Sequence, residues 1–274
     1  MKMHNKICYF YSIQHKLGTS HARIDGEQVQ TNRALQEIAF RVSNVEPSKL
    51  AILLSGSLPL EDTYLAAKLG KKYGSKLVAQ ISPEDDAASK FLNRFSFSEL
   101  PQQQIILAIG DIFSLHPTIS RKIHDARFSE RGNFFAVIDN SCSRTSRFAR
   151  SFLRAVPGKV ADIIEALAHA VSGEQYSLEE TGVDEAEFEQ LATTLKSAGW
   201  CTVIFAPGIG HFNNAIRIAF WAKKLAKARH FGFAVMGTGC NGRGSARLLS
   251  ALGFPGTNAV LDAIGRDEVQ SLLC

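Results

Sequence analysis

Residues 231–261, FGFAVMGTGCNGRGSARLLSALGFPGTNAVL, contain a short apolar run followed by a glycine-rich loop. The run 231–236 predicts a buried strand, and residues 245–252 predict a helix that ends before Gly253. Glycines let a backbone approach a ligand closely, with free N–H groups directed at it. The loop therefore either holds a nucleotide-like cofactor or is the remnant of a loop that did. Its four glycines are Gly237, Gly239, Gly242 and Gly244.

The loop matches the pattern G-x-G-x-x-G, which joins a strand to a helix in dinucleotide-binding folds. The next strand-like run, residues 258–261, ends at Asp262, twenty residues after Gly242, where a ribose-binding carboxylate is expected. Only twelve residues follow Asp262, whereas a dinucleotide fold begins with such a loop and continues with further strands. A tight turn would use the same glycines, so both interpretations stay open.

Short apolar strands alternate with helices along the rest of the chain, which is typical of a doubly wound, mostly parallel α/β sheet. Strands are predicted at residues 50–54, 76–81, 104–109, 133–138 and 202–206. Helices are predicted at residues 28–42, 60–73, 117–126, 146–155, 159–171, 183–198 and 213–229. The polar segment between residues 82 and 100 is expected to be irregular.

The turn Pro157-Gly158 is the predicted boundary between two α/β domains. We expect an N-terminal extension at residues 1–48, a first α/β domain at 49–156, and a second at 157–274 that carries the glycine-rich loop. A chain of 274 residues is long enough for a sizeable core.

Composition predicts a cytoplasmic protein. Hydrophobic residues make up 45% of the chain and charged residues 21%, and no apolar run approaches the roughly 18 residues of a membrane span. The five cysteines are scattered, without the C-x-x-C spacing of zinc or iron–sulfur sites. The net charge of +5 permits an acidic partner without requiring one, and no nucleic-acid-binding module is visible.

Polar residues follow several of the predicted strands. They are Gly110-Asp111, Asp139-Asn140-Ser141 and Gly208-Ile209-Gly210-His211. His116 lies a few residues after Asp111. Ligands of open α/β sheets bind at the carboxyl ends of the strands. Turns and helix caps use the same residue types, so each tip has a structural explanation as well. Together the tips predict a cleft without showing that it is occupied.

Four arginines, Arg144, Arg147, Arg150 and Arg154, recur at spacings of three or four. On the predicted helix they would form one basic stripe. A solvated face or a subunit interface explains such a stripe, and so does a site for phosphates or a polyglutamate-like chain. For catalysis the sequence offers no G-x-S-x-G elbow, no H-x-x-x-H pair and no paired carboxylates.

Three segments carry a resemblance to the molybdopterin oxidoreductases. They are IILAIGDIFSLHP (105–117), FAVIDNSCSRTSRFA (135–149) and the segment from Met236 to Pro255. The last is similar to the pattern M-R-G-H-x-N-x-x-G-A…T-G-Y/F-P found in the B-type subunits of formylmethanofuran dehydrogenases. Residues that match these patterns are Asp139, Thr145, Ala149, Met236, Asn241, Gly244, Gly253, Phe254 and Pro255.

The resemblance implies the two central α/β layers of that superfamily, without its iron–sulfur domain and C-terminal barrel. The four-cysteine cluster site and the metal-ligating cysteine have no counterpart, and Gly237 and Gly239 replace the arginine and histidine of M-R-G-H. It thus implies that the molybdopterin or tungstopterin and the iron–sulfur cluster are lost. The implied vestigial cleft consists of Gly110, Asp111, His116, Asp139, Thr145, Gly208, Gly210, His211, Gly237, Gly239, Asn241, Arg243 and Gly244.

The function that the resemblance implies is that of a non-catalytic, structural subunit. Methylotrophic bacteria have a formyltransferase/hydrolase complex, in tetrahydromethanopterin-linked oxidation of formaldehyde to formate, and one of its subunits resembles these B-type subunits. The implied partner is its amidohydrolase-like subunit, with an anionic methanofuran-type carrier as a candidate contact for the arginines. The alternatives are a remnant of the same superfamily in another complex, such as the large subunit of NADH dehydrogenase, and a dinucleotide- or pterin-nucleotide-binding oxidoreductase subunit that uses Gly237–Gly244.

Overall fold

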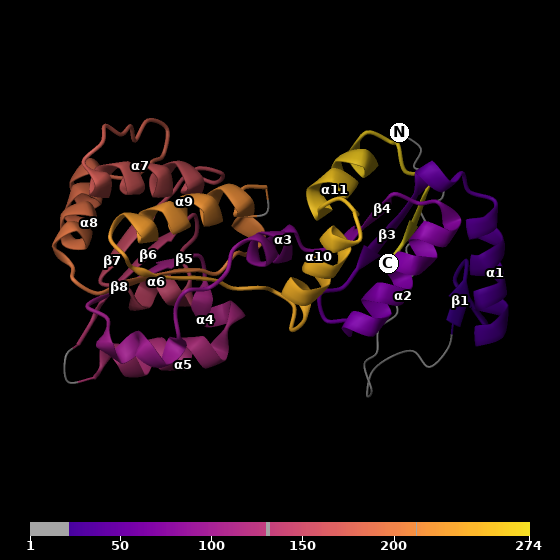
Figure 1. The fold of residues 1–274 in the computed structure, drawn as a ribbon, viewed down its shortest axis with the longest axis horizontal. Coiled ribbons are helices and arrows are strands. Elements are labelled where there is room, and N and C mark those ends of the chain that lie inside the picture. Colours follow the sequence, from indigo (N-terminus) through magenta and orange to yellow (C-terminus); the bar gives the residue numbers. More distant parts are fainter. Residues whose placement is uncertain (1–21, 130–131, 212) are drawn as a thin grey trace. The chain divides into compact units, whose positions relative to one another are not determined.

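The computed structural model describes residues 22–129, 132–211 and 213–274, which form two compact units. Unit 1 consists of the described residues up to Ile81 together with Gly244–Cys274, and unit 2 is Ser82–Arg243 (Figure 1). The chain therefore enters unit 2 after Ile81 and leaves it after Arg243. Residues 1–21 of the predicted extension, with Cys8, lie outside the described residues.

Unit 2 contains a five-stranded sheet in which all neighbouring strands are parallel. The order is β7-β6-β5-β8-β9. Because helices cover both faces, its central strands are continuous apolar runs rather than alternating ones. The strands are β5 (Ile105–Ile109), β6 (Phe134–Asp139), β7 (Ser151–Arg154), β8 (Cys201–Phe205) and β9 (Gly232–Val235).

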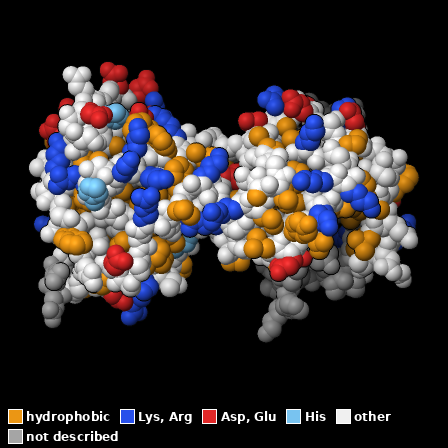
Figure 2. Space-filling view, in the orientation of Figure 1, with side chains coloured by type: hydrophobic (Ala, Val, Ile, Leu, Met, Phe, Trp, Pro, Cys, Tyr) orange, Lys and Arg blue, Asp and Glu red, His pale blue; other side chains and the backbone are white. Residues whose placement is uncertain are grey.

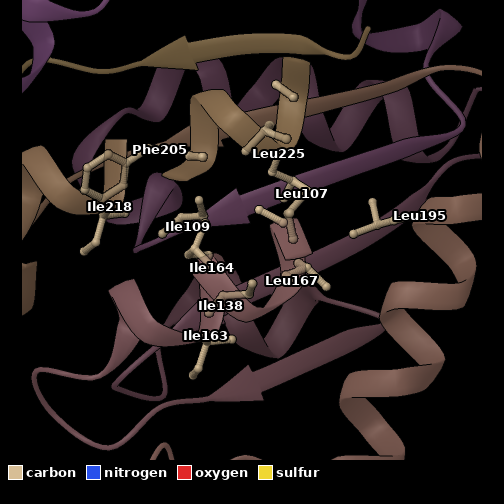
Figure 3. Close-up of a cluster of buried hydrophobic side chains, with 14 of the residues drawn as sticks. Leu107, Ile109, Ile138, Ile163, Ile164, Leu167, Leu195, Phe205, Ile218 and Leu225 are labelled. Carbon is tan, nitrogen blue, oxygen red and sulfur yellow. The ribbon is translucent and has the colours of Figure 1, made fainter. Parts of the chain in front are cut away.

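Alternate side chains of each strand point to opposite faces, and each face has its own core. One face packs against α3 (Pro83–Lys90), α7 (Val160–Ser172), α8 (Glu185–Ser197) and α9 (Ala215–Ala228). The other packs against η2 (Phe97–Gln102), α4 (Ile112–Leu115), α5 (Pro117–Arg127) and α6 (Arg144–Phe148). Figure 3 shows Leu107, Ile109, Ile138 and Phe205 of the first face among the side chains of α7, α8 and α9.

Unit 1 is built on a smaller parallel sheet of order β10-β3-β4. Its strands are β3 (Leu50–Leu54), β4 (Leu77–Gln80) and β10 (Ser271–Leu273). One face packs against α11 (Thr257–Gly265), and the other against α2 (Leu60–Tyr73) and α10 (Gly242–Ala251). The remaining elements are the hairpin β1 (Ala22–Ile24) and β2 (Glu27–Val29), α1 (Thr31–Ser43), and η1 (Pro47–Lys49), with η3 (Ile209–His211) in unit 2.

Local end signals predicted several elements correctly. Helix α2 has the predicted bounds and ends at Gly74, which has the left-handed φ of 77° that favours glycine. Helix α8 lies within the predicted range 183–198, and Asp184 caps it by accepting a 3.0 Å hydrogen bond from the N–H of Glu187. The predicted parallel α/β class is confirmed in both units.

Three predicted elements are wrong. The helix at 146–155 is the short α6 followed by β7, because the backbone after residue 150 pairs with β6. The strand-like run 258–261 lies in α11, which shows that a short apolar run does not distinguish strand from helix. The segment expected to be irregular, 82–100, contains α3 and η2.

The predicted domain boundary at Pro157-Gly158 is also wrong. Strands β5–β7, before this turn, and β8–β9, after it, belong to one sheet. A turn between two stretches predicted as helices looks like a linker, although here it joins the last strand of one half of the sheet to α7. Within the described residues, no helix is both long and apolar enough to cross a membrane.

Candidate functional site

The carboxyl ends of β5, β6 and β8 meet at one edge of the unit 2 sheet. In the register of the sheet, Ile109 lies beside Ile138 on one side and beside Phe205 on the other. The chain proceeds from β5 to β6 and β7 in one direction, and from β8 to β9 in the opposite one. This reversal is a topological switch point, where open α/β sheets form their ligand-binding crevice.

Gly110 directly follows β5 at this switch point. Its N–H donates a 3.0 Å hydrogen bond to the carbonyl of Ile138, and its φ is 88°. A Cβ at this position would lie 2.2 Å from the carbonyl oxygen of Ala206 and 3.0 Å from Cε1 of His211. Only glycine is compatible with both this φ and the short distances to Ala206 and His211, so these two residues lie directly against the backbone of Gly110.

His211 and Asp139 form a buried pair in the crevice. The His211 side chain is 3% exposed and its Nε2 lies 3.4 Å from Oδ1 of Asp139. The N–H of Gly208 donates to Nδ1 at 3.2 Å, so in a neutral ring the proton is on Nε2, which makes no hydrogen bond among the described residues. The ring packs edge-on against Phe205. Asp139 also accepts a 2.8 Å hydrogen bond from the N–H of Asn140.

Asp111 and Thr145 form a second polar pair at this edge. The Thr145 hydroxyl donates to Oδ1 of Asp111 at 2.5 Å and accepts the N–H of Phe113 at 2.9 Å. Asp111 also caps α4 by accepting the N–H of Ser114. Burial opposes ionisation of Asp111, but the hydrogen bonds from Ser114 and Thr145 outweigh it and hold its pKa below the usual value.

The remaining predicted tip residues lie at the rim. The Asn140 side chain donates to the carbonyl of Gly210 at 3.3 Å, and a Cβ on Gly210 would lie 2.4 Å from that side chain. A Cβ on Gly208 would be in contact with Leu115 at 3.4 Å. His116 joins α4 to α5, and burial lowers its pKa. Asn140, which was predicted to follow a strand but not to belong to the cleft, therefore contacts Gly210 of the neighbouring loop.

The glycine-rich loop surrounds a carboxylate of the same chain. Asp85 of α3 is fully buried, and its Oδ1 accepts the N–H of Thr238 at 2.8 Å. A Cβ on Gly242 would lie 2.0 Å from Oδ2 of Asp85, and one on Gly237 would lie 2.9 Å from Oδ1. Burial raises the pKa of Asp85, and the hydrogen bonds from Thr238 and Gly239 partly oppose this rise.

Glu84 and Asp85 are site residues that the sequence did not reveal. Glu84 is 5% exposed, burial raises its pKa, and His211 is close enough to oppose that rise. The overlooked signal is Pro83 followed by acids, since proline at the first helical position and acids in the first turn mark a helix start. Nothing in that signal predicts that the two carboxylates would be buried.

The predicted site residues therefore form two groups in unit 2. The crevice group consists of Gly110, Asp111, His116, Asp139, Thr145, Gly208, Gly210 and His211. Around Asp85 lie Gly237, Gly239 and Gly242, while Arg243 donates to the carbonyl of Phe91 just after α3. Asn241 lies in the loop between β9 and α10, and Gly244 belongs to unit 1.

The predicted arginine stripe does not form. Arg144 and Arg147 lie on α6, Arg150 lies between α6 and β7, and Arg154 ends β7. The N–H of Arg150 donates to the carbonyl of Phe135 at 2.8 Å, which draws the chain into the sheet and ends the helix. The four arginines therefore do not share one helix face.

The predicted ribose-binding acid is not at the end of a strand. Asp262 lies inside α11 in unit 1, where its carbonyl accepts the N–H of Arg266. The glycine loop is also not located where a dinucleotide-binding loop occurs. Such a loop follows the first strand of the fold, whereas this one follows β9, an edge strand. The arrangement expected for a dinucleotide site is therefore absent from the described residues.

The chain's own groups occupy space at both of these positions. At the switch point, His211 lies buried against Asp139, and a Cβ on Gly110 would meet the carbonyl oxygen of Ala206. In the glycine loop, Asp85 accepts backbone N–H groups. The described residues also include no cluster of three or more His, Cys, Asp or Glu side chains suited to a metal ion.

Unit 2 also has a shallow hollow between α7 and α9, of about 340 Å³. Lys and Arg side chains gather over these helices on the face shown in Figure 2. Lys224 lies 4.5 Å from the centre of the Trp221 ring, and His169 contacts Glu174 at 2.5 Å. The aromatic face and the carboxylate give these groups partners within the chain, so the hollow does not stand out as a ligand site.

No family model matches the chain. In sequence it is 26% identical, over 196 residues, to the alpha subunit of the F420-dependent formate dehydrogenase 1 of Methanococcus maripaludis. In structure it is similar to a chain of the formyltransferase/hydrolase complex of Methylorubrum extorquens, solved with methylofuran, with a TM-score of 0.61 and 14% identity. It is also similar to the acetylene hydratase of Pelobacter acetylenicus, with a TM-score of 0.54 and 16% identity.

The chain has a parallel α/β fold, and its structural neighbours are proteins of the molybdopterin-oxidoreductase-like family. The similarity covers 66% of this chain and 29% of the formate dehydrogenase subunit, and 77% of this chain and 34% of the hydratase. For the formyltransferase/hydrolase complex it covers 91% of this chain and 74% of the matched chain. The resemblance and the fold class predicted from the sequence are confirmed.

Proposed function

We propose that the chain is a non-catalytic, structural subunit of a formyltransferase/hydrolase complex in tetrahydromethanopterin-linked one-carbon metabolism. The supporting observation is the extent of the structural match, 91% of this chain and 74% of the matched chain of such a complex. The match to acetylene hydratase leaves about two thirds of that enzyme without a counterpart, since it covers 34% of it. Because a fold does not by itself determine a function, this proposal is an analogy at the level of the fold, which the co-expression experiment below tests.

The filled crevice supports a non-catalytic role. A cofactor-dependent enzyme of this fold class needs an open crevice at the switch point. Here Gly110 packs against the backbone of Ala206, and the His211 ring lies buried above it. On this proposal the ancestral pterin and iron–sulfur cluster are lost, and the polar strand ends stabilise the fold instead of binding a cofactor.

The partners follow from the same assignment. The chain would dock on the amidohydrolase-like subunit of the complex in the cytoplasm, and a methylofuran-type carrier would be bound within the assembly. The arginines of α6 and β7 would contact an anionic partner or that carrier, because guanidinium groups pair well with carboxylates.

A second candidate function is that of an oxidoreductase subunit that uses a pterin nucleotide. It is favoured by the sequence match to a formate dehydrogenase subunit, whose 26% identity exceeds that of the structural neighbours. The absorbance spectrum of the native protein separates the two functions. A pterin or cluster chromophore supports the second candidate, whereas absorption from aromatic residues alone supports the first.

Co-expression with the transferase and hydrolase subunits of such a complex tests the proposed function. We expect this chain to co-purify with them in a fixed ratio and formyl hydrolysis to be lost when it is omitted. A stable and fully active complex that forms without this chain would contradict the proposal.

A further inference from the structure

The Asp85 carboxylate lies next to hydrogen-bond donors of the glycine loop. The glycine loop leads into α10, whose ten residues give its N-terminus a partial positive charge. The N–H groups of Thr238 and Gly239 and the Thr238 hydroxyl all donate to the Asp85 carboxylate. Loops of this type in other α/β proteins direct the same groups at a phosphate or carboxylate of a ligand.

The glycines of the loop are required by the position of this carboxylate. A Cβ on Gly242 would lie 2.0, 2.2 and 2.5 Å from the three carboxyl atoms Oδ2, Cγ and Oδ1 of Asp85. A Cβ on Gly237 would also be too close, at 2.9 Å from Oδ1. The two glycines therefore give the carboxylate the close backbone approach that a phosphate receives in a nucleotide-binding loop.

Asp85 belongs to α3, not to the glycine loop, and its carboxylate points toward Gly237 and Gly242 of that loop. The residue is completely buried, and its Oδ2, which faces Gly242, has no hydrogen-bond partner among the described residues. It lies in α3, four residues after the chain enters unit 2, while the loop ends where the chain leaves unit 2. Asp85 thus joins the entering and leaving segments across 153 residues of sequence.

We propose that the glycine loop at residues 237–242 is an anion-binding cradle that Asp85 fills in cis, so that the carboxylate clasps together the segments by which the chain enters and leaves unit 2. The G-x-G-x-x-G pattern then serves a carboxylate of the protein itself. Removal of that carboxylate should open the cradle to a small external carboxylate of the same shape.

Chemical rescue of Asp85→Ala with sodium formate tests this proposal. The substitution removes the three carboxyl atoms that formate supplies, so formate should raise the urea midpoint of unfolding along a saturable 1:1 binding curve. Formamide, which is neutral and of similar shape, should rescue little, and all samples share one ionic strength. The matched control is Asp184→Ala, which removes a carboxylate that also accepts a helix N-terminal N–H but through an exposed hydrogen bond.

A formate effect confined to Asp85→Ala would support the cradle. An equal effect of formate on Asp85→Ala, Asp184→Ala and the wild type would overturn it. If Asp85→Ala does not fold, Asp85→Asn decides the matter through hydrogen exchange of the Thr238 and Gly239 amides. Faster exchange than in the wild type supports a cradle that needs the charge, and unchanged exchange overturns it.

Discussion

The switch-point crevice and the glycine loop are both places where α/β proteins bind ligands, and here each is filled in a different way. The crevice is closed by residues close to its own strands in sequence, since Ala206 and His211 come soon after β8. The loop is closed by Asp85, which comes from α3 and lies 153 residues before Thr238. Residues that follow a strand directly can be recognised in the sequence as polar strand ends. A residue that comes from a distant part of the sequence, as Asp85 does, cannot be recognised in this way.

The two regions also differ in charge chemistry. In the crevice, Asp111 has hydrogen bonds strong enough to lower its pKa despite burial. In the loop, burial dominates and raises the pKa of Asp85. The ionised form of Asp111 is therefore stabilised by its hydrogen bonds. The ionised form of Asp85 is destabilised by burial, and the backbone N–H donors offset only part of this effect.

The largest expected effect is that of Gly110→Ala in the crevice. Its Cβ would meet the Ala206 carbonyl at 2.2 Å with φ at 88°, so we expect a loss of about 3 kcal/mol or more in the free energy of unfolding, measured with urea. Gly158→Ala is the matched control, because its φ is 87° and a Cβ there would have no neighbour within 4 Å. Equal losses in both variants would contradict the closed crevice.

A smaller loss is expected for Gly242→Ala, whose Cβ would lie 2.0 Å from the Asp85 carboxylate. Because a side chain can move more easily than the backbone of Ala206, we expect the free energy of unfolding to fall by about 1–3 kcal/mol. The control is Gly265→Ala, at a helical residue with nothing within 4 Å of the added Cβ. A loss no larger than that of the control would show that Asp85 does not occupy the loop.

The hydrogen bond between Thr145 and Asp111 is expected to contribute less. Thr145→Val should lower the free energy of unfolding by about 1–2 kcal/mol, because it leaves the N–H of Phe113 without its acceptor. Thr194→Val, which removes an exposed hydroxyl bonded to the carbonyl of Gln190, is the control.

The same variant should change the pH dependence. The lowered pKa of Asp111 means that its stabilising effect is present above the unfolded-state pKa and is lost as the pH falls through the folded-state value. The difference in stability between wild type and Thr145→Val should therefore shrink on acidification. A difference that stays constant from about pH 7 to about pH 3 would exclude a contribution through Asp111.

The smallest effect is expected for the titration of Asp85. Its folded-state pKa is raised above 3.8, so the stability of the wild type falls as the pH rises from that value through the folded pKa, and then levels off. Asp85→Asn lacks this titration, so its stability relative to the wild type should rise over the same interval. Urea unfolding between about pH 4 and about pH 7 measures the difference, and a difference independent of pH would contradict the burial of the carboxylate.

Much of the fold could be predicted from local signals. Helix α8 follows from the Asp184 cap, α2 from Gly74, and the central strands from their apolar runs. The short elements could not be predicted, because α6 and β7 have five and four residues and their arginine spacing imitates one longer helix. Here pairing with β6, a tertiary contact, decides the structure.

The candidate site was predictable only in part. Polar residues after β5, β6 and β8 must meet because the strands are parallel, and this correctly brought Asp111, Asp139 and His211 to one edge of the sheet. The roles of Glu84 and Asp85 could not be predicted, since acidic residues at a helix start are normally exposed. Only the folded structure shows that the glycine loop contacts one of them.

The most direct test of a structural subunit without a cofactor is native mass spectrometry of the chain, affinity-purified from its own cells with its partners. We expect an assembly that contains hydrolase and transferase subunits and that releases this chain at the mass of its polypeptide alone, without the added mass of a cofactor. A chain that carries the added mass of a pterin nucleotide, or that is isolated without such subunits, would contradict it.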